Sequence, residues 1–93
     1  MVNNMESITK FRHPNGNIKC EQHYVNDKLH NEKWYYESGL ICYEWYFLNS
    51  KLHNEEGPAY TAYSEDGVIK CKEYYIHGKK ITDKLKTAII MGA

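Results

Sequence analysis

The segment Gly39–Lys51, GLICYEWYFLNSK, decides the fold, because related segments occur twice more in the chain without gaps. The other two copies are GNIKCEQHYVNDK at Gly16–Lys28 and GVIKCKEYYIHGK at Gly67–Lys79. In chain order, the first glycines of the copies are 23 and then 28 residues apart. The tetrapeptide Leu-His-Asn-Glu follows the copies that begin at Gly16 and Gly39. A repeat of this length indicates a supersecondary unit that stacks on copies of itself.

Each copy has the pattern of a β-hairpin. Each copy begins at a glycine that follows a polar residue, in the dipeptides Asn15-Gly16, Ser38-Gly39 and Asp66-Gly67. Asn-Gly and Asp-Gly favour two-residue type I′ turns, in which both central residues need positive φ. Second turns are predicted at Asn26-Asp27-Lys28, Asn49-Ser50-Lys51 and His77-Gly78-Lys79. We therefore expect an antiparallel meander with strands near 8–14, 17–25, 33–37, 40–48, 60–65 and 68–76.

The turn positions also predict how the side chains divide between the two faces. With two-residue turns, Trp34 pairs with Tyr43 and Tyr36 pairs with Ile41, and alternate residues of a strand share a face. One face then carries most of the apolar side chains, among them Phe11, Ile18, Cys20, Trp34, Tyr36, Ile41, Tyr43, Trp45, Phe47, Tyr60, Ala62, Ile69 and Cys71. The other face is mixed and polar.

A short helix is expected after the sheet, at 82–91. Leu85, Ala88 and Ile89 would line one side of it, but a helix about 15 Å long covers only part of the apolar face. Curling of the sheet, a second copy of the chain or a partner protein would have to bury the remainder. The predicted layout is an N-terminal cap at 1–7, repeat units at 8–32, 33–55 and 56–80, and a C-terminal helix and tail at 81–93.

Composition excludes several classes of function. Twelve basic and twelve acidic residues give zero net charge, which argues against nucleic-acid binding and against binding to anionic membranes. The three cysteines are an odd number without CxxC spacing, which favours reduced thiols and a cytoplasmic location. The sequence contains no glycine-rich phosphate loop and no nucleophile elbow, so we predict neither a cofactor nor an enzyme.

Two constellations resemble chemical sites, and the predicted geometry argues against both. His30 with Glu32 and His53 with Glu55 are candidate metal ligands, but equivalent positions in adjacent hairpins lie two strands apart, about 9.6 Å. Zinc holds each ligand at about 2.0–2.2 Å, so one ion cannot bridge the two histidines. Cys20 and His13 fall on the apolar face, where a reactive thiolate is disfavoured. We predict no metal site and no catalytic residue.

Lys51–Asp66, KLHNEEGPAYTAYSED, resembles the MORN-repeat variants found in giant viruses, phages and bacteria, including the YwqK-type antitoxin group. The resemblance extends over roughly residues 8–80. It implies a viral or phage protein with an elongated, twisted antiparallel sheet of stacked hairpins, and a non-enzymatic role in protein interaction or assembly. The Gly-x-Gly core of classical MORN repeats is missing, so membrane association is not implied.

We expect the aromatic residues to bind a protein partner, a second copy of the chain as a homodimer, or both. The expected partner-binding residues are Trp34, Tyr36, Tyr43, Trp45, Phe47 and Tyr60 on the apolar face, with Tyr46 and Tyr74 on the other. Intramolecular core is an open alternative for the first group, and a stabilising cross-strand ladder for Tyr46 and Tyr74. Two other functions stay open: a small inhibitor of a toxin or host protein, and a binder that sequesters a small ligand.

Overall fold

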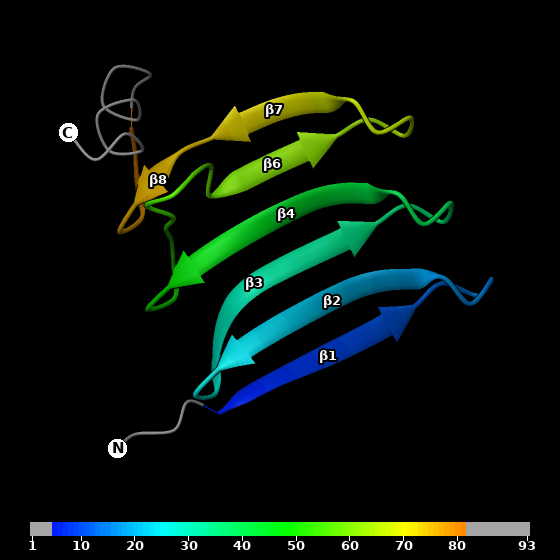
Figure 1. Ribbon diagram of the computed structural model, residues 1–93, viewed down its shortest axis with the longest axis horizontal. Helices are drawn as coiled ribbons and strands as arrows, with labels where there is room; N and C mark the ends of the chain where they lie inside the picture. Colours follow the sequence, from blue (N-terminus) through cyan, green and yellow to red (C-terminus); the bar gives the residue numbers. More distant parts are fainter. Residues whose placement is uncertain (1–4, 82–93) are drawn as a thin grey trace.

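The chain forms a single-layer antiparallel β-sheet (Figure 1), seen in a computed structural model that describes residues 5–81. The path is β1 (Glu6–Arg12), β2 (Ile18–Val25), β3 (Lys28–Tyr35), β4 (Ile41–Leu48), β6 (Tyr60–Tyr63) and β7 (Ile69–Glu73). Two short additions are β5 (Lys51–Leu52), paired with β4, and the hairpin of β8 (Tyr75–Ile76) with β9 (Lys79–Lys80). The predicted all-β antiparallel meander is confirmed. The helix expected at 82–91 lies outside the described residues.

The turns that open the repeats are three-residue loops, so the type I′ prediction for them is wrong. The Gly39 N–H donates to the Tyr36 carbonyl over 2.9 Å, and the Tyr36 N–H donates to the Leu40 carbonyl over 2.8 Å. Gly39 has a φ of 97°, whereas Ser38 does not have positive φ. This is a type I turn that ends in a left-handed glycine. The same bonds recur at 13–17 and 64–68, and one glycine per turn satisfies the geometry.

The type I′ turns lie at the opposite ends of the hairpins. Both central residues have positive φ in all three: Asn26 (51°) and Asp27 (65°), Asn49 (50°) and Ser50 (66°), and His77 (49°) and Gly78 (82°). Asn and Asp tolerate this region better than most residues. Because only two residues separate β2 from β3, β3 begins at Lys28 rather than near residue 33.

The register slips by one residue beside each three-residue loop. Trp34 pairs with Tyr43 as predicted, but the next pair is Tyr35 with Ile41, so the predicted pairing of Tyr36 with Ile41 is wrong. The same shift follows the pairs Phe11–Cys20 and Ala62–Cys71, both of which were predicted. A β-bulge absorbs the residue that the longer loop adds, so the rest of each strand keeps its predicted facing.

The regular register aligns charged residues in a row across one face. The row comprises Lys10, Glu21, Lys33, Glu44, Thr61 and Lys72. Lys10 forms an ion pair with Glu21 at 3.7 Å, and Lys33 forms one with Glu44 at 3.8 Å. Cross-strand pairs of opposite charge contribute roughly 0.2–1 kcal/mol each. Neighbouring strands from β1 to β4 therefore carry opposite charges in this row, and Thr61 separates Glu44 from Lys72.

The repeated Leu-His-Asn-Glu segment adopts two conformations. In the first copy it continues β3, and the buried Asn31 donates to the Trp45 carbonyl over 2.9 Å. In the second copy the chain leaves β5 after Leu52, and the Asn54 side chain instead holds a loop by donating to the Pro58 carbonyl over 3.1 Å. The extra residues around Gly57 and Pro58 therefore divert the second copy out of the sheet.

Little of the sheet is deeply buried. The fold measures 45 × 40 × 18 Å, and among the described residues only Cys20 and Ala59 are fully buried hydrophobic side chains.

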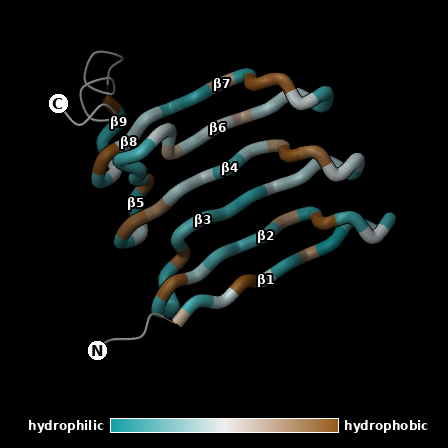
Figure 2. Tube along the Cα trace, in the orientation of Figure 1, coloured by the Kyte–Doolittle hydropathy of each residue, from teal (hydrophilic) through white to brown (hydrophobic). Residues whose placement is uncertain are grey.

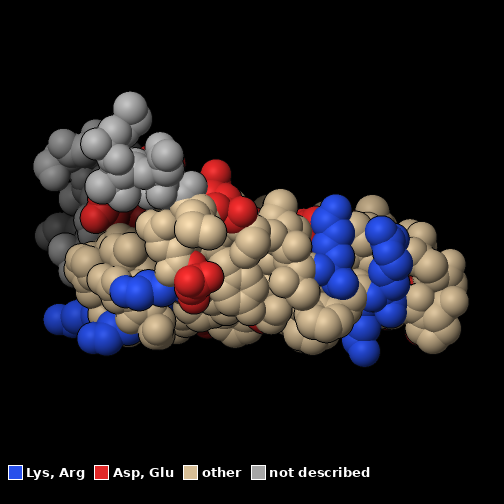
Figure 3. Space-filling model, turned by 90° about the horizontal axis from the view of Figure 1, so that it is seen from below, with Lys and Arg blue, Asp and Glu red and all other residues tan. Residues whose placement is uncertain are grey.

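Apolar segments recur at the starts of β4 and β7 (Figure 2), where Leu40 and Val68 are exposed. Seen from the β1 edge, basic side chains gather toward the two ends of the view and acidic side chains lie mainly between them (Figure 3). No helix within residues 5–81 is both long and apolar enough to cross a membrane.

Candidate functional site

Four aromatic side chains from three adjacent strands form one connected group, which we call the aromatic cluster: Trp34, Tyr43, Trp45 and Tyr60. The rings of Trp45 and Tyr60 are 4.3 Å apart between centroids, those of Tyr43 and Trp45 are 6.1 Å apart, and those of Trp34 and Tyr43 are 6.3 Å apart. Tyr43 and Trp45 therefore share a face, as the alternation of β4 predicted. All four side chains are only half-buried.

Strand pairing places these rings in contact. Trp34 lies opposite Tyr43, and Trp45 lies opposite Tyr60, so each contact joins neighbouring strands. Aromatic pairs of this kind contribute about 0.5–1.5 kcal/mol beyond the area they bury. The cluster thus stabilises the junction of β3, β4 and β6, while its outer side forms an aromatic surface.

Glu32 organises the polar side of the aromatic cluster. Trp34 donates its indole N–H to Glu32 Oε1 over 2.8 Å, and Gln22 donates its amide to Glu32 Oε2 over 2.8 Å. Glu32 also lies opposite Trp45 in the register. Sequence reasoning missed this residue as part of the surface, although its spacing of two from Trp34 was a usable signal.

A second carboxylate lies at the far side of the cluster, on β7. Glu73 pairs with Tyr60 in the register and accepts a hydrogen bond from the Tyr75 hydroxyl over 3.1 Å. Partial burial raises the pKa of Tyr60, and electrostatic interactions with Cys71 and Glu73 raise it further. The Tyr60 hydroxyl is a hydrogen-bond donor at neutral pH, as tyrosine ordinarily is.

A hollow of about 460 Å³ adjoins the cluster toward the β1 edge. Its lining includes Phe11, Cys20, Gln22 and Trp34. Phe11 is 51% exposed and Cys20 is 2% exposed, although both line the hollow. Beyond Trp34 the aromatic surface therefore borders a shallow hollow that Arg12 and Lys19 also line.

Two of the six partner-binding residues predicted on the apolar face lie outside the aromatic cluster. Tyr36 is in the turn after β3, and its hydroxyl donates to the Tyr63 carbonyl over 2.7 Å. That bond links the turns of the second and third repeats. Phe47 lies near the other end of β4, opposite Leu52, where it lines hollows together with His30 and Leu48.

Tyr46 lies on the opposite face from Trp45. Its ring is 6.3 Å from that of His30, which in turn is 5.8 Å from that of His23. Burial, together with the charge and hydrogen bond of Glu44, raises the pKa of Tyr46 to about 12. Tyr74 lies between β7 and β8, where its carbonyl accepts a bond from the Ile81 N–H over 2.9 Å. Tyr46 therefore contacts His30, and His30 in turn contacts His23.

Cys20 is a buried thiol, and the ring of His13 makes a hydrogen bond to the backbone. Burial raises the pKa of the Cys20 thiol, and the charges of Glu32 and Glu21 raise it further. The His13 ring is 2.9 Å from the Tyr35 carbonyl, which accepts its Nε2–H. A raised pKa reduces the thiolate fraction on which nucleophilic attack depends.

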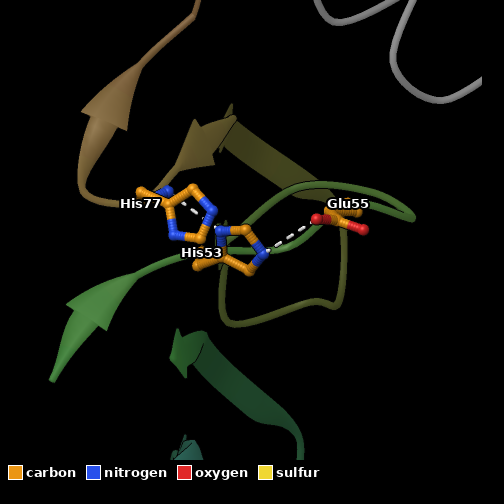
Figure 4. A group of neighbouring side chains, drawn as sticks. All are labelled: His53, Glu55 and His77. Carbon is orange, nitrogen blue, oxygen red and sulfur yellow. Dashed lines mark hydrogen bonds and ion pairs between the residues drawn. The ribbon is translucent and has the colours of Figure 1, made fainter. Parts of the chain in front are cut away.

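A third group brings together His53, Glu55 and His77, whose offered ligand atoms all lie within 4.8 Å of one another (Figure 4). Sequence reasoning considered His53 and Glu55 with His30, and missed His77. The β8–β9 turn brings His77 against the loop after β5, where the two imidazole rings are 4.4 Å apart. The usable signal was a histidine at a turn position that is Asn26 and Asn49 in the other copies.

Comparison with known proteins gives one match. Residues 5–26, which contain β1 and β2, match the family described as the MORN repeat variant. Comparison with curated proteins and with solved structures gave no match. MORN repeats are general, non-enzymatic modules that often mediate contacts with proteins or membranes. The match covers the first hairpin of the chain, which is less than half of its 93 residues.

Proposed function

We propose that this chain is a non-enzymatic interaction module that binds through its aromatic cluster. The observation that carries the proposal is the half-buried group of Trp34, Tyr43, Trp45 and Tyr60 on a sheet with one layer. Tryptophan and tyrosine are enriched among residues that dominate binding energy. Glu32 holds the Trp34 ring in place, so less side-chain entropy is lost when a partner packs on it.

The first partner we propose is a second copy of the chain. Two sheets packed face to face, about 10 Å apart, would remove both aromatic clusters from water. Zero net charge limits repulsion between the copies. We place this assembly in the cytoplasm, where the three free cysteines stay reduced.

Sedimentation equilibrium combined with tryptophan fluorescence tests the proposal, because both tryptophans of the chain lie in the cluster. We expect a dimer at micromolar concentration and a shift of the emission to shorter wavelength as the dimer forms. Trp45→Ala should weaken dimerisation at least tenfold. Tyr63→Ala, outside the cluster, is the control and should dimerise normally.

Circular dichroism would establish that both variants fold before their association is compared. A wild-type chain that remains monomeric at high micromolar concentration would exclude the second copy as partner. Capture of one stoichiometric host or toxin protein, lost in Trp45→Ala, would then support the same surface with a different partner. Equal association of both folded variants would contradict the assignment of the cluster.

A further inference from the structure

The segment at Leu52 and His53 and the turn between β8 and β9 are held together by hydrogen bonds from two backbone N–H groups. The Gly78 N–H donates to the Leu52 carbonyl over 2.8 Å, and the His77 N–H donates to His53 Nδ1 over 2.9 Å. A Cβ at Gly78 would lie 3.3 Å from the Lys51 side chain, so the two segments are in close contact. The side chains of His53 and His77 are therefore held together by the backbone.

From this arrangement we propose that His53, Glu55 and His77 bind one divalent ion of the zinc class, with water completing the coordination. Two imidazoles and one carboxylate form a ligand set known in zinc sites that keep an open position. His53 Nε2 and Glu55 Oε1 are 3.5 Å apart. Ligands about 2.0–2.2 Å from a tetrahedral ion are separated from each other by roughly 3.4 Å, so this pair is already at the required spacing.

The backbone at His77 supports a role for its side chain. His77 has a φ of 49°, in the left-handed region. The first and second repeats have Asn26 and Asn49 at the equivalent turn position, and Asn adopts this conformation readily. A non-glycine residue held in this sparsely populated backbone region is a reason to examine the site for a function.

Burial makes His53 the fixed member of the group. Its side chain is 9% exposed, whereas that of Glu55 is 68% exposed and can rotate toward an ion. A hollow of about 460 Å³ is lined by both residues and by Asn54 and Glu56. This hollow provides space for the water ligands and an entry route for the ion.

The hydrogen bond at His53 Nδ1 specifies how binding must proceed. Because Nδ1 accepts the His77 N–H, the proton of the neutral ring lies on Nε2, the nitrogen that faces Glu55. Coordination of the ion through Nε2 requires the proton to leave this nitrogen, and the neutral ring then carries its proton on Nδ1. The bond from the His77 N–H is lost in the process. Metal binding therefore competes with one backbone hydrogen bond, which predicts modest affinity.

Isothermal titration of the full chain with zinc chloride, in a buffer that does not coordinate zinc, tests this site. The key variant is His77→Asn, because asparagine occupies the equivalent turn position in both other repeats and the turn should stay intact. Loss of an outer-shell partner already lowers metal affinity by roughly 10- to 100-fold, so loss of a ligand should cost at least that. Glu55→Gln should also weaken binding. His23→Gln removes a histidine on β2 that belongs neither to the group nor to the lining of the hollow, and is the control.

We expect one zinc ion per wild-type chain, and a rise in melting temperature with zinc that is absent in His77→Asn. Amide exchange at His77 should become faster when zinc is bound, because the N–H loses its acceptor. Wild-type chain that binds no zinc at millimolar concentration would overturn the proposal. So would His77→Asn that folds and binds with wild-type affinity, which would assign the ion to other residues such as the cysteines.

Discussion

Trp34 and Glu32 lie two residues apart on β3, and the indole N–H of Trp34 donates to Glu32 Oε1 over 2.8 Å. The same carboxylate accepts a bond from Gln22 on β2. One acidic residue thus connects two strands and sets the angle of a tryptophan that belongs to the aromatic cluster.

Replacing this carboxylate should destabilise the fold. In Glu32→Gln one acceptor oxygen becomes a donor, so at least one of the bonds from Trp34 and Gln22 is lost. Hydrogen bonds to charged groups contribute about 1.5–3 kcal/mol, and partial exposure places our expectation at about 1–2 kcal/mol. Urea denaturation would measure it. Glu56→Gln, at an exposed loop position, should change the free energy of unfolding by less than about 0.5 kcal/mol.

The left-handed glycine of the repeat turn should not tolerate a side chain. Gly39 has a φ of 97°, although only Asn17 lies near the position of an added Cβ, at 3.8 Å. Gly39→Ala should therefore lose about 1–2 kcal/mol through backbone strain rather than steric clash. Gly57→Ala is a matched comparison, since Gly57 lacks positive φ and also has one neighbour at 3.8 Å. Thermal unfolding that ranks the two variants equally would contradict this account of the turn.

Stability at high pH should depend on Tyr46. Its pKa rises from 10.0 in the unfolded chain to about 12 in the fold, mainly through burial. The folded chain thus retains a proton that the unfolded chain loses, so this contribution is complete below pH 10 and disappears as the pH rises toward 12. Tyr46→Phe should flatten the loss of stability in that range, and ultraviolet titration should show one fewer late-titrating tyrosine. An unchanged late titration would assign it to another residue.

The three thiols should differ in reactivity. Cys20 is 2% exposed and burial raises its pKa, whereas Cys42 and Cys71 are partly exposed. Alkylation of the native protein should therefore modify Cys20 last, as measured by mass spectrometry of its peptides. Unfolding in urea should equalise the three rates. Early modification of Cys20 in the native protein would show that the β1–β2 hairpin opens readily.

Much of the fold follows from local patterns. The repeat of Gly16, Gly39 and Gly67 located the hairpins, and alternation along β4 placed Tyr43 and Trp45 on one face. The turn types were assigned to the wrong ends because glycine was taken to require a type I′ turn. A type I turn with a terminal left-handed glycine uses the same residues, and the two differ by one residue in register. The β-bulge beside the loop offsets this difference, so that Trp34 pairs with Tyr43 as predicted.

The contacts between repeats could not be predicted in the same way. His53 and His77 belong to segments that carry different sequences in the two repeats, and no spacing rule connects them. Their contact depends on Leu52 ending β5 and on the β8–β9 turn bonding to it. Likewise, the identical segments that contain Asn31 and Asn54 adopt different conformations, because only the second is followed by the Gly57-Pro58 loop.

The charged row has a consequence for what can join the sheet at its ends. Lys10 on β1 and Lys72 on β7 occupy the two outermost positions of the row, and both are exposed. If one molecule continued the sheet of another in register, these two ammonium groups would meet directly, and like charges in that position are destabilising. Edge lysines of this kind hinder open-ended fibre growth. The two borders of the sheet therefore discourage end-to-end polymerisation of the molecule.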